Sequence, residues 1–199
     1  MENEMPSKRL LVLKMSISID GFVAGPNGEM DWMLASRDEE GAAWVTATLS
    51  AAGVHIMGHR TYHDMAAYWP TSTLPMAAAM NEIPKVIFSR SGEISAPAAD
   101  PQLYTDWLHP EYAGSDLVCD IAELKGRSGG YILAHGGASF AQSLVAADLI
   151  DEYRLVVHPV ALGRGLPLFP ELASPLNLEL VEVKSFKAGA VAKRYMRVR

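Results

Sequence analysis

The stretch YILAHGGAS, residues 131–139, decides which fold this sequence is expected to adopt. Its first four residues, Tyr131 to Ala134, are an apolar run typical of a buried strand, and a helical pattern covers Ala138 to Ala147. Gly136 and Gly137 join the two, and glycine lets a backbone approach a bound group closely. Because the free N–H groups of a helix start attract anions, the stretch predicts a strand, turn and helix that can hold a phosphate.

Two further predicted strands are also followed by residues that can bind a phosphate. Val54 to Met57 is typical of a short strand before a helix over Thr61 to Ala67, and Lys85 to Phe88 is typical of a buried strand. An arginine placed after a strand can bind a phosphate with two hydrogen bonds. One glycine pair after a strand is more often only a tight turn, but three such ends in order favour a dinucleotide site. The predicted cofactor contacts are Gly58, His59, Arg60, Thr61, Ser89, Arg90, Gly136, Gly137, Ala138 and Ser139.

Strand and helix patterns alternate along most of the chain. Two further strands are predicted over Leu10 to Ile17 and Glu152 to Val157, and two further helices over Asp38 to Ala52 and Ser115 to Lys125. Alternating segments near the end, joined by a turn at Lys187 to Gly189, predict a closing hairpin. This order favours an α/β fold with a central, mostly parallel sheet, helices on both faces and an antiparallel hairpin at its C-terminal edge.

Composition limits the classes of protein and partner. The chain has 199 residues and a formal net charge of -6, so we expect a disordered start at 1–9 and one domain over 10–199. An acidic surface argues against nucleic acid and anionic membranes as partners. The start carries no secretory signal, and no apolar run approaches the length of a membrane span. The single cysteine, Cys119, excludes a disulfide framework; we expect it to be buried and inert, in a cytoplasmic protein. Residues 91–114 are interpreted as a long surface connection.

Several of these segments resemble dihydrofolate reductases. The segment from His55 to Tyr62 looks like the one that opens the helix beside the NADPH pyrophosphate in that family. Lys85 to Ser89 looks like their next strand, whose end meets the adenosine 2′-phosphate, and Tyr131 to Ser139 looks like the glycine turn under the nicotinamide. Leu149 to Pro170 and Ser18 to Gly21 are closer still to the riboflavin-biosynthesis reductase domain. The resemblance covers the chain from about residue 10 to its end.

The resemblance implies a dihydrofolate reductase-like three-layer fold, with NADPH as the cofactor. It implies hydride transfer to a small heterocyclic substrate, as in 5-amino-6-(5-phosphoribosylamino)uracil reductase. It also implies a homodimer that pairs through the segment from Leu176, where the alternating apolar residues Leu178, Leu180 and Val183 need cover. A dihydrofolate reductase proper and a non-catalytic dinucleotide-binding protein are the alternatives, because fold alone does not fix function.

Three positions depart from the patterns of these families. His59 follows Gly58 where dihydrofolate reductases have arginine, and Arg60 comes one place later, so either side chain could meet the phosphate. Phe22 stands where riboflavin reductases usually carry lysine, which weakens the transfer of their phosphoribosyl substrate. His135 precedes the glycine pair in place of a small or acidic residue.

Two carboxylates are candidates for orienting the substrate. Asp20 follows an apolar strand, where it either forms an ordinary Asp-Gly turn or faces a polar ring from the end of the strand. Asp31, beside Trp32, could bind the N–H groups of a ring or cap a helix. We predict Asp20 and Asp31 as the catalytic residues, with Asp20 first. Tyr62 and Trp69 are interpreted as core residues rather than stacking surfaces.

One histidine pair has the spacing of a metal site. His59 and His63 are four residues apart, which can bind zinc on a helix. The residues between them lack the glutamate of a metalloprotease motif, and we therefore predict no metal site.

Overall fold

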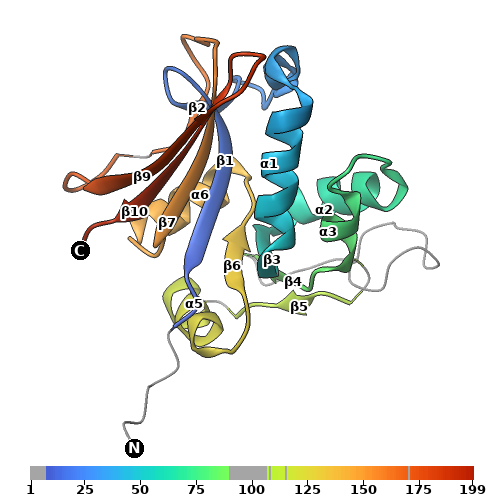
Figure 1. Ribbon diagram of the computed structural model, residues 1–199. Coiled ribbons are helices and arrows are strands. Elements are labelled where there is room, and N and C mark those ends of the chain that lie inside the picture. Colours follow the sequence, from blue (N-terminus) through green and yellow to red (C-terminus); the bar gives the residue numbers. More distant parts are fainter. Residues whose placement is uncertain (1–7, 90–106, 108, 115, 170) are drawn as a thin grey trace, which may run out of the picture.

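The computed structural model describes residues 8–89, 107, 109–114, 116–169 and 171–199. A sheet of eight strands runs through the molecule in the order β5-β4-β3-β6-β1-β7-β10-β9 (Figure 1). Neighbours from β5 to β7 are parallel, whereas β10 is antiparallel to β7 and to β9. The strands are β1 (Leu11–Ser18), β3 (Ala52–Gly58), β4 (Lys85–Phe88), β5 (Glu111–Tyr112), β6 (Tyr131–Ala134), β7 (Glu152–His158), β9 (Leu178–Ser185) and β10 (Val191–Arg197).

Helices and one small second sheet complete the fold. Strands β2 (Phe22–Ala24) and β8 (Leu166–Pro167) pair with each other apart from the main sheet. The helices are α1 (Glu39–Ser50), α2 (His59–Tyr68), α3 (Ala77–Glu82), α5 (Leu117–Gly126) and α6 (Ala138–Ala146), with 3-10 turns η1 (Asp31–Ser36) and η2 (Trp69–Thr71). Among the described residues, no helix is long and apolar enough to cross a membrane.

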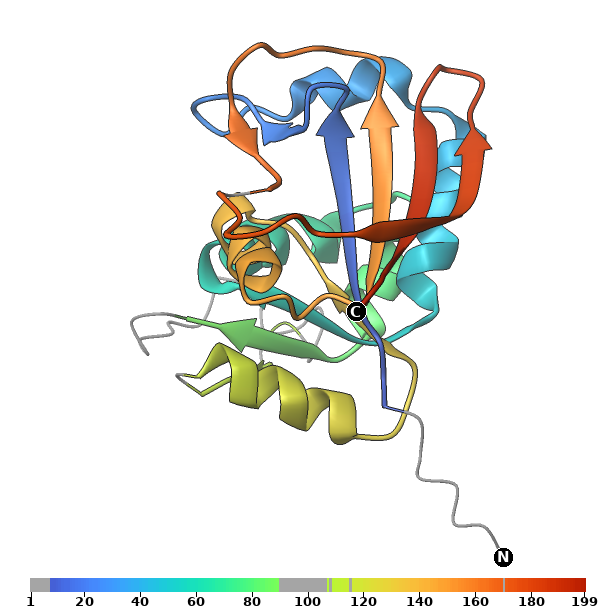
Figure 2. The ribbon, with the colours of Figure 1, turned by 90° about the vertical axis from the view of Figure 1, so that its left-hand side faces the viewer.

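Strand β1 lies in the middle of the sheet, between β6 and β7. Its side chains alternate between two buried cores, so that Leu11 and Leu13 pack on one face and Val12 on the other. Helices α5 and α6 cover the first face through Ile121 and Leu144, and α1, α2 and α3 cover the second. Figure 1 shows α1 alongside β1, and Figure 2 shows α5 and α6 in front of the sheet. The predicted three-layer α/β arrangement with its C-terminal hairpin is therefore confirmed.

The structure corrects two of the expectations drawn from the sequence. Residues 91–114 are not simply a surface connection, because Trp107 is fully buried and β5 pairs with β4 at the edge of the sheet; residues 90–106 lie outside the described residues. Cys119 is exposed, because α5 turns Ile121 and Leu124 toward the core and Cys119 away from it. Strands β2 and β8 and helix α3 were not predicted, because such short elements carry too few residues to show a period.

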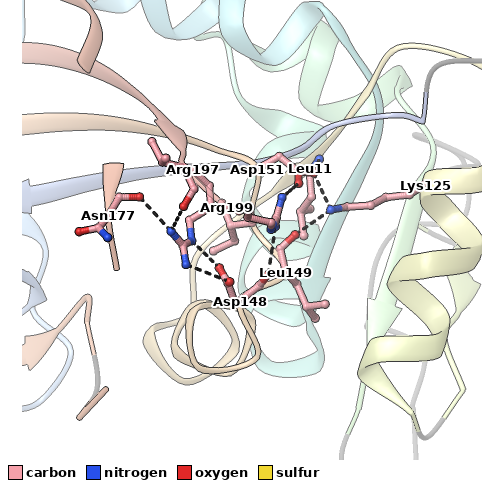
Figure 3. Close-up of polar contacts among 10 residues, drawn as sticks. Leu11, Lys125, Asp148, Leu149, Asp151, Asn177, Arg197 and Arg199 are labelled. Atoms are coloured by element: carbon pink, nitrogen blue, oxygen red, sulfur yellow. Dashed lines mark hydrogen bonds and ion pairs between the residues drawn. The ribbon is translucent and has the colours of Figure 1, made fainter. Parts of the chain in front are cut away.

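Polar contacts fix the amino end of β1 to the end of the chain (Figure 3). Asp151 accepts a hydrogen bond from the backbone N–H of Leu11 at 2.8 Å, and its Oδ2 lies 2.5 Å from the Nζ of Lys125. Its other oxygen accepts a bond from Arg199 at 2.7 Å. Of the expected N-terminal extension, residues 1–7 lie outside the described part, whereas Arg9 is packed in the fold and donates to the carbonyl of Gly130. The candidate site lies at the opposite edge of the sheet, where the parallel strands have their carboxyl ends.

Candidate active site

The carboxyl ends of the parallel strands bring the predicted contact segments together. Strand β3 pairs with β4 as far as Gly58 and with β6 as far as Ala134. Ser89 therefore begins the loop beside Gly58, and Gly136 follows on the other side of β3. Ligands of open parallel sheets bind at this edge. The three predicted contact segments, which begin at Gly58, Ser89 and Gly136, thus lie side by side. Arg90 lies outside the described residues.

Gly137 and Thr61 show how closely two of these segments approach. Gly137 precedes α6 with a φ of +87°, which favours glycine, and a Cβ placed on it would lie 2.6 Å from the Oγ1 of Thr61 in α2. A Cβ on Gly136 would lie 2.9 Å from the Sδ of Met15. Any side chain would fill this turn. The absence of a Cβ keeps backbone N–H groups accessible to a bound group, as a dinucleotide site requires.

Helices α2 and α6 both begin at this edge without a side-chain cap. Gly58 precedes α2 and Gly137 precedes α6, and neither start receives a capping hydrogen bond from a side chain. In contrast, Asp38 caps α1 and Asp116 caps α5. First-turn N–H groups have no partner within their own helix, and the helix dipole adds positive charge there. The uncapped first turns can therefore bind a phosphate, and they contain Thr61, Ala138 and Ser139.

The side chains of the first turn of α2 differ in what they contact. The Nε2 atoms of His59 and His63 lie 2.9 Å apart, so the two imidazoles hydrogen-bond to each other. Arg60 is exposed and forms no ion pair with any described residue. Of His59 and Arg60, Arg60 is therefore the better placed to contact a phosphate. Within the described ranges, no three His, Cys, Asp or Glu side chains gather as a metal-binding group.

Asp20 connects the end of β1 to a distant loop. Its carboxylate accepts hydrogen bonds from the Oγ of Ser18 at 2.5 Å and from the backbone N–H groups of Leu162 and Gly163 at 3.2 and 2.8 Å. These bonds, that of Ser18 above all, hold the pKa of the Asp20 carboxyl below its usual range. The side chain is exposed, and both of its oxygens serve these internal contacts.

The other aromatic and acidic candidates lie apart from Asp20. Asp31 is exposed at the start of η1. The neighbouring Trp32 contacts the ring of His158 edge-on, with 5.5 Å between the centroids. Tyr62 is fully buried and donates to the carbonyl of Trp107, so its interpretation as a core residue is confirmed. Trp69 packs partly buried against the same core.

Lys14 is a candidate site residue that we did not predict from the sequence. It lies in the middle strand on the face covered by α1, yet Lys14 and Ser16 are only partly buried, whereas the residues on either side of each are buried. Solvent therefore reaches β1 from this face. Burial, and then the charge of Arg37, lower the pKa of Lys14 to about 8. The sequence signal was a charged residue interrupting the apolar run of residues 10–17.

Two histidines join Lys14 on this face. His135 follows β6 and stacks edge-on against His55, with 4.5 Å between the ring centroids, and His158 ends β7 with its Nδ1 2.7 Å from the Oγ of Ser36. Burial holds the pKa of His135 well below its usual value and lowers that of His158 to about 4. The Nε2 atoms of both rings are buried and have no hydrogen-bond partner among the described residues. We call Lys14, Ser16, His135 and His158 the Lys14 face.

The structure is an α/β domain in which a polar face lies beside a glycine turn at the carboxyl edge of the sheet. The sequence matches the model of the family described as the RibD C-terminal domain over residues 9–192, and the chain belongs to this family. Membership agrees with the resemblance to the riboflavin-biosynthesis reductase domain that the sequence motifs indicated.

Solved structures support the fold. A putative riboflavin biosynthesis protein from Shewanella sp. PV-4 is 25% identical with a TM-score of 0.74, over 96% of this chain and 99% of that one. The deaminase and 5-amino-6-(5-phosphoribosylamino)uracil reductase of Thermotoga maritima is 17% identical with a TM-score of 0.67, over 96% of this chain and 57% of that one. A dihydrofolate reductase from Enterococcus faecalis in complex with NADP(H) is 13% identical with a TM-score of 0.58, over 96% and 97%. The dihydrofolate reductase-like fold predicted from the sequence is thus confirmed.

Proposed function

We propose that this protein is a reductase that uses NADPH to reduce a small heterocyclic substrate. The observation that carries the proposal is the approach of Gly137 to Thr61, which places two uncapped helix starts at one edge of the sheet. Membership of the RibD C-terminal domain family supports a reductase. The resemblance to 5-amino-6-(5-phosphoribosylamino)uracil reductases supports a pyrimidine as the substrate.

The cofactor is proposed to lie across the carboxyl edge of the sheet. NADPH supplies a hydride when bound, and the protein aligns the nicotinamide against the acceptor carbon. In this arrangement one strand end holds the pyrophosphate, the next holds the adenosine end, and the glycine turn supports the nicotinamide. The residues in these roles are Gly58, His59, Arg60 and Thr61, then Ser89 and Arg90, then Gly136, Gly137, Ala138 and Ser139.

The substrate is proposed to lie on the Lys14 face, next to the glycine turn. Lys14 can hold or release a proton near neutral pH, because its pKa is about 8. Asp20 is proposed as a positioning residue that holds residues 162–163 against the end of β1. Asp31 is proposed as the second carboxylate that orients the acceptor ring. These contacts together would exclude water from the ring during hydride transfer.

A homodimer is proposed through the open end of the sheet. Leu180, Val181 and Val183 on β9 are 52%, 50% and 50% exposed. Figure 2 shows α5 and α6 in front of one half of the sheet, whereas β9 and β10 lie open. Exposed apolar residues on an edge strand require cover, and a second copy of the chain provides it. We also propose that the protein works in the cytoplasm.

Cofactor titration tests the proposal most directly. We expect NADPH to bind at least about tenfold more tightly than NADH, because each charge-assisted bond from an arginine to the 2′-phosphate contributes roughly 1.5–3 kcal/mol. Arg60→Ala and Arg90→Ala should each reduce this preference. Lys184→Ala, on β9, is the control and should leave it unchanged. Equal affinities of wild type for the two cofactors would remove the basis for NADPH.

Turnover separates the proposed enzyme from the alternatives. NADPH oxidation is followed by absorbance with 5-amino-6-(5-phosphoribosylamino)uracil-type substrates and with dihydrofolate. Faster oxidation with the pyrimidines supports the proposed substrate class, and faster oxidation with dihydrofolate supports a dihydrofolate reductase proper. Tight NADPH binding with no turnover of any ring compound would favour a non-catalytic dinucleotide-binding protein.

A further inference from the structure

The Lys14 face carries positive charge from more than one element. Lys14 belongs to β1, and Arg37 directly follows η1; their charges act on each other and on His158 at the end of β7. His135, after β6, also lies within the field of Lys14. Arg154 is the register partner of Lys14 on β7 and bonds to Glu152. The basic groups on this face therefore converge from three strands and one turn.

Two acidic side chains near this face, Asp38 and Asp20, are occupied by other contacts. Within the described residues, neither Lys14 nor Arg37 forms an ion pair. The carboxylate of Asp38, next to Arg37, accepts bonds from the backbone N–H groups of Gly41 and Ala188 at 2.7 and 2.8 Å. The carboxylate of Asp20 holds residues 162–163. The ammonium of Lys14 is thus a partly buried charge with no acidic partner among the described residues, which is costly unless a ligand supplies one.

We propose that the acceptor bound on the Lys14 face is an anion: a small heterocyclic ring whose carboxylate or ionised ring oxygen lies against Lys14 and Arg37. The inference rests on the proposed reductase function and names the class of substrate. His135 and His158 would hydrogen-bond to other polar atoms of the same ring, since each has a buried Nε2 without a partner among the described residues.

Matched pairs of ring compounds test the charge preference. Isothermal titration measures the affinities of orotate against uracil, nicotinate against nicotinamide, and pterin-6-carboxylate against pterin, each with and without saturating NADPH. We expect the carboxylate to bind at least about tenfold more tightly in one or more pairs. Lys14→Met and Arg37→Gln should each remove most of this difference. Arg37 is exposed, so its substitution leaves the fold intact.

Lys193 provides a matched control for Lys14. It is another partly buried lysine in the sheet, but its register partner Leu155 also pairs with Met15, so Lys193 belongs to the opposite face. Lys193→Met should keep the preference for the carboxylate. If Lys193→Met reduces the preference as much as Lys14→Met does, nonspecific surface charge explains it and the inference is wrong.

Proton uptake gives a second readout that a structural role of Lys14 would not change. At pH 8.5 Lys14 is mostly neutral, because its pKa is about 8. Binding of an anion should cause the Lys14 amine to take up a proton. Titrations in buffers of different ionisation enthalpy should therefore show uptake of roughly half a proton per site. Lys14→Met should show no such uptake. No preference for the carboxylate in any pair overturns the inference, even if NADPH binds. A preference that persists when NADPH fails to bind keeps the anion site and rejects the reductase.

Discussion

The carboxylate of Asp20 accepts a hydrogen bond from the backbone N–H of Gly163, which lies 143 residues further along the chain, at 2.8 Å. Through this bond the end of the central strand determines where the loop after β7 lies. Leu162 contributes a second bond to the same carboxylate. The same hydrogen bonds therefore stabilise the turn predicted at Asp20 and underlie the proposed role of Asp20 as a positioning residue.

Replacing this carboxylate by an amide should affect turnover more than cofactor binding. Asp20→Asn keeps the shape, but one of its two side-chain atoms can no longer accept a backbone N–H. We expect NADPH affinity to change little and reduction of a pyrimidine- or pterin-type ring to fall at least about tenfold, which corresponds to losing ~1.4 kcal/mol of transition-state binding. Steady-state kinetics measure this. Normal turnover by Asp20→Asn and slow turnover by Asp31→Asn would transfer the role to Asp31.

The glycine turn gives a prediction with a control of nearly the same backbone angle. Gly137→Ala places a methyl group 2.6 Å from the Oγ1 of Thr61 at a φ of +87°. Gly28→Ala meets the same kind of strain at +91°, but nothing lies within 4 Å of its Cβ. Both variants should lose about 1–2 kcal/mol of stability from backbone strain, and Gly137→Ala should lose more because its methyl group meets Thr61. Only Gly137→Ala should also bind NADPH at least about tenfold more weakly; equal losses of affinity would show that the turn does not form the cofactor site.

Buried histidines predict a loss of stability in mild acid. The pKa values of His55 and His158 are lowered from 6.5 to about 4, by burial first of all. The unfolded chain therefore takes up protons before the folded protein does, and stability present above pH 6.5 is lost as the pH falls toward 4. Each ring should cost about 2 kcal/mol between pH 7 and pH 5. Urea unfolding of His158→Asn should show a pH dependence smaller by about this amount; an unchanged dependence would contradict the buried neutral ring.

The edge strand should control the oligomeric state. Leu180→Glu introduces a charge at the centre of the exposed apolar residues of β9, so the homodimer should dissociate to monomers at micromolar concentration in light scattering. Val118→Glu is the control, because Val118 is 54% exposed on α5, away from β9, against 52% for Leu180. A monomeric wild type, or a dimer that tolerates Leu180→Glu, would place the interface elsewhere or exclude it.

The fold was predicted correctly from the sequence where the apolar periodicity and the position of glycine indicate the same element. The apolar run of β1, the strand and turn at residues 131–139 and the closing hairpin were all predicted because each carries a local pattern. Trp107 was missed because its burial depends on Tyr62 and Asn81, residues far away in sequence that it bonds through its carbonyl and indole N–H. Cys119 was misplaced because free cysteines are more often buried than exposed.

The candidate site was only partly accessible to sequence reasoning. The segments around Gly58 and Gly136 were found because glycine after a strand has a local meaning. Lys14 was not found, because periodicity treats a single charge in an apolar run as an interruption, and only the parallel register shows that it lies level with His135. The contacts of Asp20 likewise need the distant loop at Gly163, which no local pattern reveals.

The position of β1 between β6 and β7 constrains how the protein can be made. The strand is synthesised before its register partners, which lie at residues 132–134 and 152–158. A nascent chain that stops between β6 and β7 therefore still carries an apolar strand with one unpaired edge, exposed to aggregation and to chaperones. Stalling or truncation before β7 emerges should yield insoluble product, whereas release after β7 should not.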